Sequence, residues 1–282
     1  MAEIVLENIS FYHGKDTPYE VKALNNINTT ISHGIITGLI GHTGSGKSTL
    51  VQLFNGLLKP AEGRVLIDGT DIWSKPKDIR DIRFRVGLVM QYPEYQLFEE
   101  TIYKDIAFGP KNMGVKGEEI EARVLEAADF VGLERELLEK SPFDLSGGQK
   151  RRAAIAGIIA MRPDVLVLDE PAAGLDPRGR DSIFNNIINY QKKSGATVVI
   201  VSHSMEDMAR ICDELIVMAN GEIFMKGDKQ TVFADPDKLS AIGLDVPQIA
   251  RLMNMLKARG VDVDSGIYTV EQAYDFIKNK LR

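Results

Sequence analysis

The sequence IITGLIGHTGSGKSTL, residues 35–50, joins an apolar strand-like run to a glycine-rich loop and then to the start of a helical pattern. The loop fits G-x-x-x-x-G-K-S in the strand-to-helix context that this phosphate-binding motif requires. Its glycines let backbone N–H groups turn toward phosphate oxygens, and the helix N-terminus adds a partial positive charge. The expected nucleotide-binding residues are Gly41, Thr43, Gly44, Ser45, Gly46, Lys47, Ser48 and Thr49.

Two side chains of this loop have distinct expected roles. Lys47 is expected to reach the β- and γ-phosphates, and the hydroxyl of Ser48 is expected to bind Mg²⁺. The alternative is a glycine-rich turn that binds nothing, and the strand and helix on either side make it the weaker interpretation. The sequence therefore predicts a P-loop nucleoside triphosphatase.

Charged side chains follow two further apolar strands. Asp169 and Glu170 end a run that begins VLVL at residue 165, and His203 follows the run Thr197–Val201. Ligands of open α/β sheets bind at the carboxyl ends of the strands. We expect Asp169 to hold Mg²⁺, Glu170 to polarise the attacking water as a general base, and His203 to contact the γ-phosphate. The alternative is a set of ordinary strand-end side chains, which the nearby phosphate loop makes less favoured.

The composition excludes several classes of protein. The chain has 282 residues and a net charge of −6, which gives no electrostatic case for binding nucleic acid. A single cysteine, Cys212, rules out an intramolecular disulfide and fits a reducing compartment. The first residues, MAEIV, show no secretion signal, and no apolar run approaches the roughly 20 residues that span a bilayer. Any role at a membrane is therefore expected to come through a partner.

Strand-like and helix-like segments alternate along most of the chain. This order predicts an α/β fold with a mixed, mainly parallel sheet and an antiparallel N-terminal β subdomain. Ile82–Met90 is expected to be a strand, and Asn220-Gly221 a tight hairpin turn. A helical insertion at about 94–146 separates the two halves of the sheet. We expect an ATPase domain at 1–228 and a small helical appendage at 229–282.

The sequence LSGGQ narrows the class. P-loops also occur in kinases, GTPases and helicases, but LSGGQ at the start of a helix, just before VLVLDE, closely resembles the signature of ATP-binding-cassette (ABC) ATPases. Other family elements match in order over about residues 3–228: Gln91 stands at the Q-loop glutamine, Ala173–Asp176 resembles the D-loop, and His203 the switch histidine. The resemblance implies ATP and Mg²⁺, with Glu170, His203 and Gln91 as catalytic residues. The Mg²⁺-binding residues that it implies are Ser48, Gln91 and Asp169.

The signature also implies an assembly. The hydroxyl of Ser146 and the N–H groups of Gly147 and Gly148 lie at a predicted helix start, where they form a second anion site. In the ABC family two cassettes pair head to tail, and the signature of one closes on the γ-phosphate held by the other. The resemblance therefore implies a second ABC ATPase subunit, either a paralogue or another copy of this chain. The signature and D-loop residues that it assigns are Leu145, Ser146, Gly147, Gly148, Gln149 and Asp176.

The adenine site departs from the family pattern. ABC ATPases place an aromatic side chain near residue 13, ahead of a segment that here reads Ala23-Leu24, and this chain has Tyr12-His13 there. Histidine stacks on adenine less well than a larger aromatic ring. Both Tyr12 and His13 are therefore expected at the nucleotide base.

The stretch QYPEYQLFEETIYKDIAFGP, residues 91–110, combines aromatic side chains with carboxylates. This mixture is typical of a protein interface, and importer cassettes contact their membrane subunits just after the Q-loop glutamine. The carboxylates are expected to pair with arginines of a membrane protein; the alternative is a solvated loop with a few buried aromatics. The expected docking residues are Tyr92, Glu94, Tyr95, Phe98, Glu99, Glu100 and Asp105.

The same stretch resembles the ATPases of energy-coupling factor transporters, which take up vitamins or transition-metal ions. Asp16–Glu20 and the late segment IGLDVPQIARLMNMLKARG, residues 242–260, resemble the second of two paralogous ATPase types, although Asp16 replaces a glycine of that pattern. The resemblance implies a transmembrane coupling protein, a small membrane substrate-binding protein, and a peripheral position on the cytoplasmic face of the membrane. The appendage is expected to help hold the ATPase pair together.

Other functions stay open. An ordinary ABC importer cassette would bind two membrane subunits of another kind. A non-transport cassette, in DNA repair or on ribosomes, would usually carry two cassettes, long coiled-coil insertions or basic patches. A nucleotide sensor that does not turn over is disfavoured by Glu170 and His203. The sequence does not identify the transported substrate.

Overall fold

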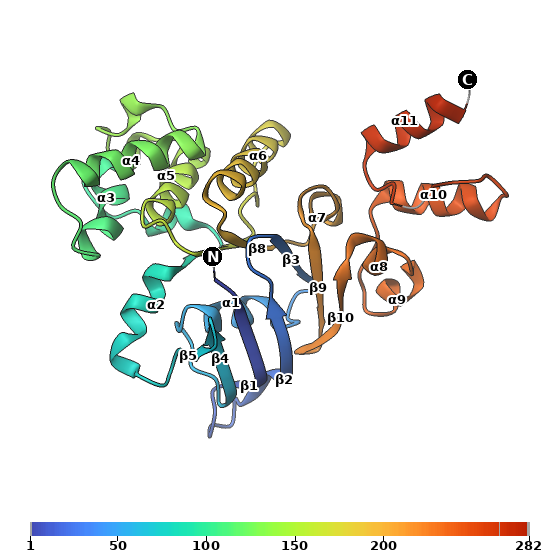
Figure 1. Ribbon diagram of the computed structural model, residues 1–282, viewed down its shortest axis with the longest axis horizontal. Helices are drawn as coiled ribbons and strands as arrows, with labels where there is room; N and C mark the ends of the chain where they lie inside the picture. The colour runs from blue at the N-terminus through green and yellow to red at the C-terminus, as the bar shows by residue number, and fades with distance from the viewer. Residues whose placement is uncertain (1, 265, 281–282) are drawn as a thin grey trace.

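Two β-sheets of different kinds organise the computed structural model, which describes residues 2–264 and 266–280 (Figure 1). In the smaller sheet all neighbouring strands are antiparallel, in the order β2 (Val21–Ile31), β1 (Ile4–His13), β4 (Glu62–Ile67) and β5 (Thr70–Asp71). The larger sheet has the order β10 (Glu222–Asp228), β9 (Glu214–Ala219), β3 (Ile36–Gly41), β8 (Thr197–Val201), β7 (Val165–Asp169) and β6 (Val86–Val89). Its neighbours are parallel except for the β9–β10 hairpin. This is the mixed, mainly parallel architecture that the sequence predicts.

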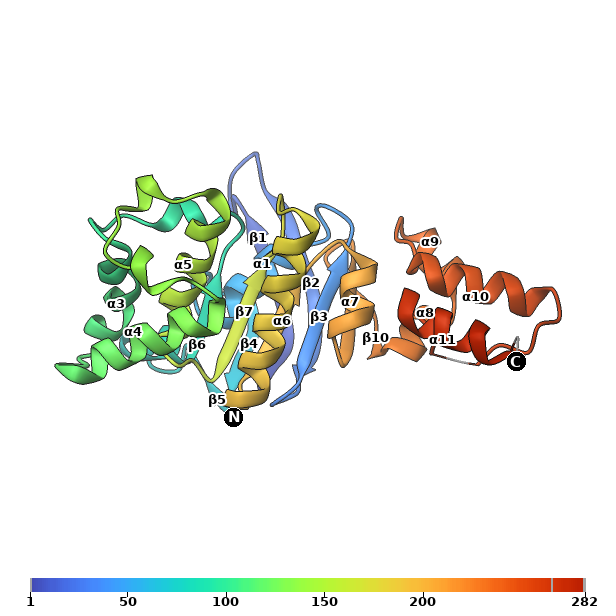
Figure 2. The same cartoon turned by 90° about the horizontal axis from the view of Figure 1, so that it is seen from above.

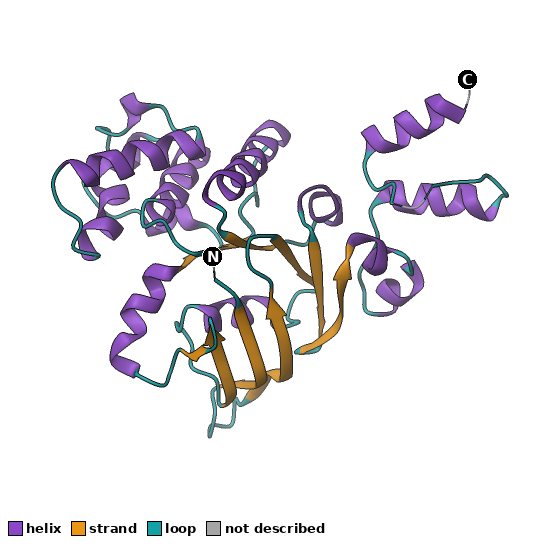
Figure 3. Ribbon diagram, in the orientation of Figure 1, coloured by secondary structure: helices purple, strands orange, loops and turns teal. Residues whose placement is uncertain are grey.

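Helices cover the larger sheet and extend beyond both of its edges (Figures 2 and 3). Those before the seventh strand are α1 (Lys47–Phe54), α2 (Ile79–Arg85), α3 (Ile102–Asn112), α4 (Glu118–Val131) and α5 (Gly147–Ile159). Those after it are α6 (Pro177–Ser194), α7 (Met205–Ile211), α8 (Lys229–Phe233), α9 (Pro236–Ala241), α10 (Gln248–Ala258) and α11 (Val270–Lys280). Short 3₁₀ turns lie at Pro76–Asp78, Pro93–Gln96, Arg135–Leu137 and Pro142–Asp144.

Helix α1 packs in the core that joins the two sheets. Its buried Leu50, Leu53 and Phe54 belong to one hydrophobic cluster with residues of the small sheet and of β3, β6, β7 and β8. Burial of this helix on several sides fixes its N-terminus relative to the strands. The phosphate loop that precedes α1 is therefore held from both ends.

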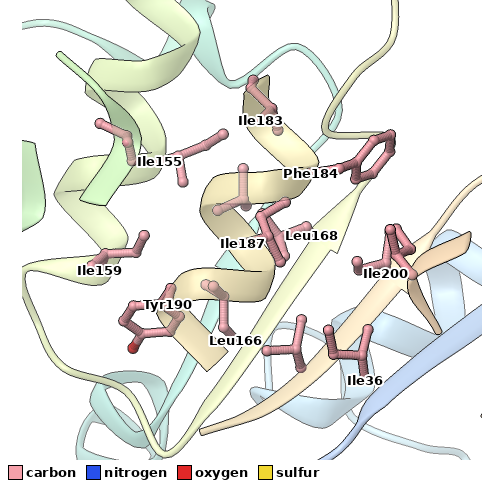
Figure 4. Packing of buried hydrophobic residues seen from close by; sticks show 14 of the residues in the cluster. Ile36, Ile155, Ile159, Leu166, Leu168, Ile183, Phe184, Ile187, Tyr190 and Ile200 are labelled. Carbon is pink, nitrogen blue, oxygen red and sulfur yellow. The ribbon is translucent and has the colours of Figure 1, made fainter. Parts of the chain in front are cut away.

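The opposite face of the larger sheet packs against α5 and α6. Figure 4 shows Ile155 and Ile159 of α5 and Ile187 of α6 close to Leu166 and Leu168 of β7. The same cluster includes apolar residues of α3 and α4. The helical insertion therefore shares one continuous core with the sheet rather than forming a separate unit.

Two expectations about the chain's organisation need correction. Part of the expected strand Ile82–Met90 is helical: α2 ends at Arg85, and only Val86–Val89 is strand. The reason is that Ile79 and Ile82, three residues apart, both pack on the core between the sheets, as one face of a helix does.

The second correction concerns the appendage. Several apolar residues that follow 228 belong to the main core, whereas a separate small cluster forms only farther along the chain. The residues in the main core are Val232, Phe233, Leu239, Val246 and Ala250. The residues in the separate cluster are Met253, Ile267, Ala273 and Phe276. The distinct part of the appendage therefore consists of α10 and α11, at the right of Figure 1.

Candidate nucleotide site and its surroundings

A cleft of about 960 Å³ opens at the carboxyl edge of the parallel strands. Gly41 ends β3 and Asp169 ends β7, while Gln91 and His203 follow β6 and β8. These strands run parallel, so their carboxyl ends lie on one edge of the sheet. The expected catalytic residues and the phosphate loop therefore line one cleft, as the sequence predicts.

The phosphate loop has a backbone that suits an anion. Gly44 and Gly46 have φ values of +82° and +98°, in the left-handed region that favours glycine. Nothing lies within 4 Å of a Cβ built on Gly44, so this part of the loop is open. The hydroxyl of Ser45 is buried and has no hydrogen-bond partner. Ser45 is fully buried and is not among the residues that line the cleft, so the open backbone at Gly44, rather than this hydroxyl, is the part of the loop that suits a phosphate.

Lys47 lies at the centre of this loop. Its ammonium donates hydrogen bonds to the carbonyl oxygens of Gly41 at 2.8 Å and His42 at 3.0 Å. Burial lowers the pKa of this ammonium, while Glu170 and Asp169 act in the opposite direction. The loop carbonyls thus hold the cation where phosphate oxygens would be bound.

The acidic pair at the end of β7 has two different environments. Asp169 is buried, which raises the pKa of its carboxyl group, while a hydrogen bond with Ser48 opposes that rise. Glu170 has a left-handed backbone with φ of +50°, and its N–H donates to the Val201 carbonyl at 3.0 Å. This conformation costs a non-glycine residue roughly 1–2 kcal/mol. Asp169 contacts Ser48 whereas Glu170 contacts His203, so the two adjacent carboxylates can serve separate functions.

His203 contacts the second of these carboxylates. Its Nδ1 lies 2.8 Å from Oε1 of Glu170. An ionised carboxylate only accepts hydrogen bonds, so Nδ1 donates and carries the proton. The His203 side chain is 78% exposed, whereas that of Glu170 is 14% exposed. The other ring nitrogen of His203 is therefore free to face a bound molecule.

Oxygen donors for a divalent cation meet in the same cleft. The hydroxyl of Ser48, the carboxylate of Asp169 and the amide oxygen of Gln91 come from three segments that line it. Hard oxygen ligands of this kind suit Mg²⁺, which usually binds through few protein groups together with substrate phosphates. Among the described residues no group of three or more His, Cys, Asp or Glu side chains forms a separate metal site.

The structure distinguishes the two residues expected at the base. His13 lines the cleft, and its Nε2 lies 3.2 Å from Oγ1 of Thr49 in α1. Tyr12 is not among the lining residues, and the ammonium of Lys22 lies 5.5 Å from the centre of its ring. Of the two residues, His13 therefore lies at the cleft and Tyr12 does not.

The signature segment begins α5, away from the cleft of its own chain. Ser146 caps the helix by accepting from the N–H of Gln149, whose side chain in turn accepts from the N–H of Ser146 at 2.9 Å. Gly147 has open space where a Cβ would lie. Leu145 is buried and anchors the segment. None of these residues lines the nucleotide cleft.

The D-loop residue Asp176 and the expected docking residues all lie outside the nucleotide cleft. Asp176 caps α6, with Oδ1 accepting from the N–H of Gly179 at 2.7 Å. Of the aromatic side chains expected to dock, Tyr95 is 84% exposed, Phe98 65% and Tyr92 46%. A groove of about 290 Å³ lies beside this stretch and is lined by Phe98 and Phe108 among others.

The expectation that all four carboxylates of this stretch are free for a partner is wrong for two of them. Glu94 forms a two-point ion pair with Arg151 of α5. Asp105 is buried and accepts from the N–H groups of Phe98 and Glu99, and burial raises the pKa of its carboxyl group. Glu100 pairs with Lys104 at the surface.

Sequence reasoning missed two features of the site. Arg151 is almost fully buried, although it follows closely on the signature and reads as part of a basic, exposed run. The segment Gly243–Gln248 of the appendage also lines the nucleotide cleft, near Glu206. A single sequence offers no local signal for either contact, because each partner lies far away along the chain.

Comparisons with known proteins agree with this geometry. A family model described as ABC transporter matches residues 24–173. The energy-coupling factor transporter ATP-binding protein EcfA2 of Caldanaerobacter subterraneus subsp. tengcongensis is 53% identical over 99% of this chain and 98% of its own length. The protein of the same name from Clostridium perfringens is 51% identical over 99% of this chain and 98% of its own length.

Solved structures show the same fold. CbiO1 from Clostridium perfringens, described as part of the ABC transporter complex CbiONQ, is 39% identical, with a TM-score of 0.75 over 89% of this chain and 98% of that chain. The dimeric bacterial ABC transporter cassette MJ0796 is 29% identical, with a TM-score of 0.72 over 80% of this chain and 98% of that chain.

Proposed function

This chain belongs to the ABC transporter family of ATPases, and we propose that it is the ATP-binding and ATP-hydrolysing subunit of an energy-coupling factor transporter. The observation that carries hydrolysis is the contact between Glu170 and His203 at the edge of the cleft that holds the phosphate loop. Relatives about half identical over nearly the full length support the transporter class.

The residues of the cleft divide the chemistry among them. The phosphate-loop N–H groups and Lys47 bind the phosphates and stabilise charge that builds on them. Glu170 accepts a proton from the attacking water, and His203 orients that carboxylate through its Nδ1–H. When bound, Mg²⁺ supplies Lewis-acid neutralisation of phosphate charge, and Ser48, Asp169 and Gln91 would hold it. His13 contacts the base.

A second ATPase subunit completes the site. The signature of this chain lies outside its own cleft, so it is available to the nucleotide of another cassette. Its exposed Ser146 and Gly147 at the start of α5 suit the γ-phosphate of that nucleotide. The dimer described for a 29%-identical cassette supports this arrangement.

Partners in the membrane follow from the docking stretch. The described residues contain no helix with both the length and the apolar character needed to cross a bilayer. Exposed Tyr95 and Phe98, together with the adjoining groove, offer a surface for a transmembrane coupling protein. A small membrane protein would select the substrate, a vitamin or a transition-metal ion. The chain would then work at the cytoplasmic face of the membrane.

Affinity purification of this chain from detergent-solubilised host membranes tests the proposal. We expect mass spectrometry to identify a similar ATPase, one multi-span protein and one small integral protein. Recovery of two membrane subunits of another kind would instead assign the chain to an ordinary ABC importer. Recovery of no membrane protein would contradict both transport functions and favour a non-transport cassette. A Tyr95→Ala/Phe98→Ala variant should lose the membrane partners but keep the second ATPase.

A further inference from the structure

Arg151 connects three functional segments through one side chain. It lies in α5, five residues after the first residue of that helix's capping box, Ser146, and is only 3% exposed. Its Nη2 and Nε donate to the two carboxylate oxygens of Glu94 at 2.8 and 3.1 Å. Its Nη1 donates to the carbonyl oxygen of Ala173. A single guanidinium therefore bonds to two segments that lie 57 and 22 residues away.

The positions of these partners show which functional segments the contact joins. Glu94 lies three residues after Gln91, in a 3₁₀ turn of the docking stretch that packs on α5. Ala173 lies three residues after Glu170 and three before Asp176. The guanidinium thus joins the docking stretch, the signature helix and the segment between the general base and the D-loop.

The chemistry of arginine makes this a stiff junction. A guanidinium is planar and presents donors in a fixed fork, so a two-point pair with a carboxylate sets orientation as well as distance. Glu94 has a side-chain exposure of 16%, so water screens the pair weakly. Lysine would keep the charge, but its ammonium is a compact point charge without a planar fork.

We propose that Arg151 is a positioning residue that makes the docking stretch, the signature helix and the D-loop segment move together. This role rests on the proposed function: movement of the membrane partner reaches the paired ATP sites through this junction, and movement at the ATP sites reaches the membrane partner. Neither Glu94 nor Arg151 touches the nucleotide cleft, so the action on hydrolysis is indirect. A purely stabilising ion pair would instead affect unfolding alone.

Three variants separate these roles. Arg151→Lys should break the fork and uncouple the docking stretch from residues 171–176. Glu94→Gln keeps the shape of the side chain and leaves the bond from Arg151 to Ala173 in place, so it should release only the docking stretch. Arg162→Lys is the matched control, because it changes an arginine just after α5 whose ion pair with Glu126 is about half exposed.

Hydrogen exchange of the purified ATPase assembly, with and without a non-hydrolysable ATP analogue, provides the test. In the unmodified chain the analogue should slow exchange in both 93–98 and 171–176. In Arg151→Lys and Glu94→Gln the response at 93–98 should shrink by about fivefold or more, while that of the phosphate loop persists. Arg162→Lys should respond as the unmodified chain does. A full response at 93–98 in Arg151→Lys, or none in the unmodified chain, would overturn the proposal.

Steady-state kinetics distinguish positioning from simple stabilisation. Arg151→Lys should lower kcat by about tenfold or more at a KM for ATP within about twofold of the original, because small displacements of catalytic segments are costly. A lower melting temperature with an unchanged kcat would show that the pair is only structural. These readouts need no membrane partner, so they can succeed or fail independently of the purification that tests the transport function.

Discussion

Nδ1 of His203 lies 2.8 Å from Oε1 of Glu170, and this contact joins the ends of two neighbouring parallel strands, β8 and β7. The left-handed backbone of Glu170 and its bond to the Val201 carbonyl fix one partner. The other follows β8 directly. The pair therefore depends on the sheet for its geometry, although His203 itself is largely exposed.

Glu170→Gln should remove hydrolysis while keeping nucleotide binding. The amide cannot accept the proton of the attacking water, and general-base catalysis contributes about 10²–10⁴-fold. We expect kcat to decrease by about 10²-fold or more. The affinity for ATP should stay within about threefold of the original, since the phosphate loop that supplies the binding contacts is unchanged. Fluorescent-nucleotide binding and phosphate release measure the two quantities.

His203→Ala is the companion variant. It removes the group that orients Glu170 but leaves the base itself, so its loss of kcat should be smaller than that of Glu170→Gln. The double variant should be about as slow as Glu170→Gln alone, because residues that act as a unit are not additive. Unchanged steady-state hydrolysis in Glu170→Gln would show that the general-base assignment is wrong.

Local chemistry explains what the sequence could predict. The phosphate loop and the acidic pair at the end of β7 each depend on residues that are adjacent in the chain. The same is true of the turn at Asn220-Gly221, where both residues have positive φ. The alternation of strands and helices predicted the parallel sheet, and parallel strands then bring their carboxyl ends together. The cleft followed from these features without any knowledge of side-chain packing.

Long-range contacts explain what the sequence could not predict. Glu94 reads as a surface carboxylate until its partner Arg151, 57 residues away, is known. Tyr12 and His13 are neighbours in β1, so they face opposite sides, and irregular register with β2 at Phe11/Tyr12 hides which side is which. The helical start of Ile82–Met90 depends on which face of the segment meets the core.

Asp169→Asn should stabilise the nucleotide-free protein in a pH-dependent way. Burial raises the pKa of Asp169 above its value of 3.8 in an unfolded chain. Between these two values the folded state binds more protons than the unfolded state, so this carboxyl group lowers stability as pH rises. The melting temperature of Asp169→Asn, relative to the original, should therefore increase as pH rises from about 4 and then level off above the folded pKa.

Asp228→Asn is a control in which the change of stability with pH should have the opposite sign. The N–H and the side chain of Thr231 both lower the pKa of Asp228, so its ionised form favours folding and that contribution disappears as pH falls. Thermal melts over a pH series measure both variants. A stability difference for Asp169→Asn that does not change with pH would contradict the argument from burial. Asp169→Asn should also lose hydrolysis, since Asp169 is a proposed Mg²⁺ ligand.

Gly44→Ala and Gly46→Ala form a matched pair in one loop. Both glycines have positive φ, so each substitution should cost about 1–2 kcal/mol from backbone strain alone. A Cβ on Gly46 would also lie 2.7 Å from the Ala23 carbonyl oxygen and 2.8 Å from Cδ2 of Leu24, whereas one on Gly44 meets nothing within 4 Å. Gly46→Ala should therefore be the more destabilising variant in urea unfolding. Equal unfolding free energies would mean that the loop shifts to accommodate the new methyl group.

His13 and Tyr12 offer a direct test of the base contact. His13 lines the nucleotide cleft and is held by Thr49 at 3.2 Å, whereas Tyr12 is absent from the lining. His13→Ala should raise the Kd for ATP by about 5- to 150-fold, the range that loss of one base–ring stacking contact of 1–3 kcal/mol produces. His13→Phe should bind ATP at least as tightly as the original chain, because a larger ring stacks on the base without needing the Thr49 contact.

Tyr12→Ala is the control for this pair, and its Kd should stay within about twofold of the original because the side chain faces away from the base. Titration with a fluorescent ATP analogue and competition by unlabelled ATP give the affinities. Inorganic triphosphate, which lacks a base, should bind equally well to the original chain and to His13→Ala. A loss of triphosphate binding in His13→Ala would show that the histidine supports the phosphate loop through Thr49. A large loss of ATP affinity in Tyr12→Ala would show that the base instead binds on the other face of β1.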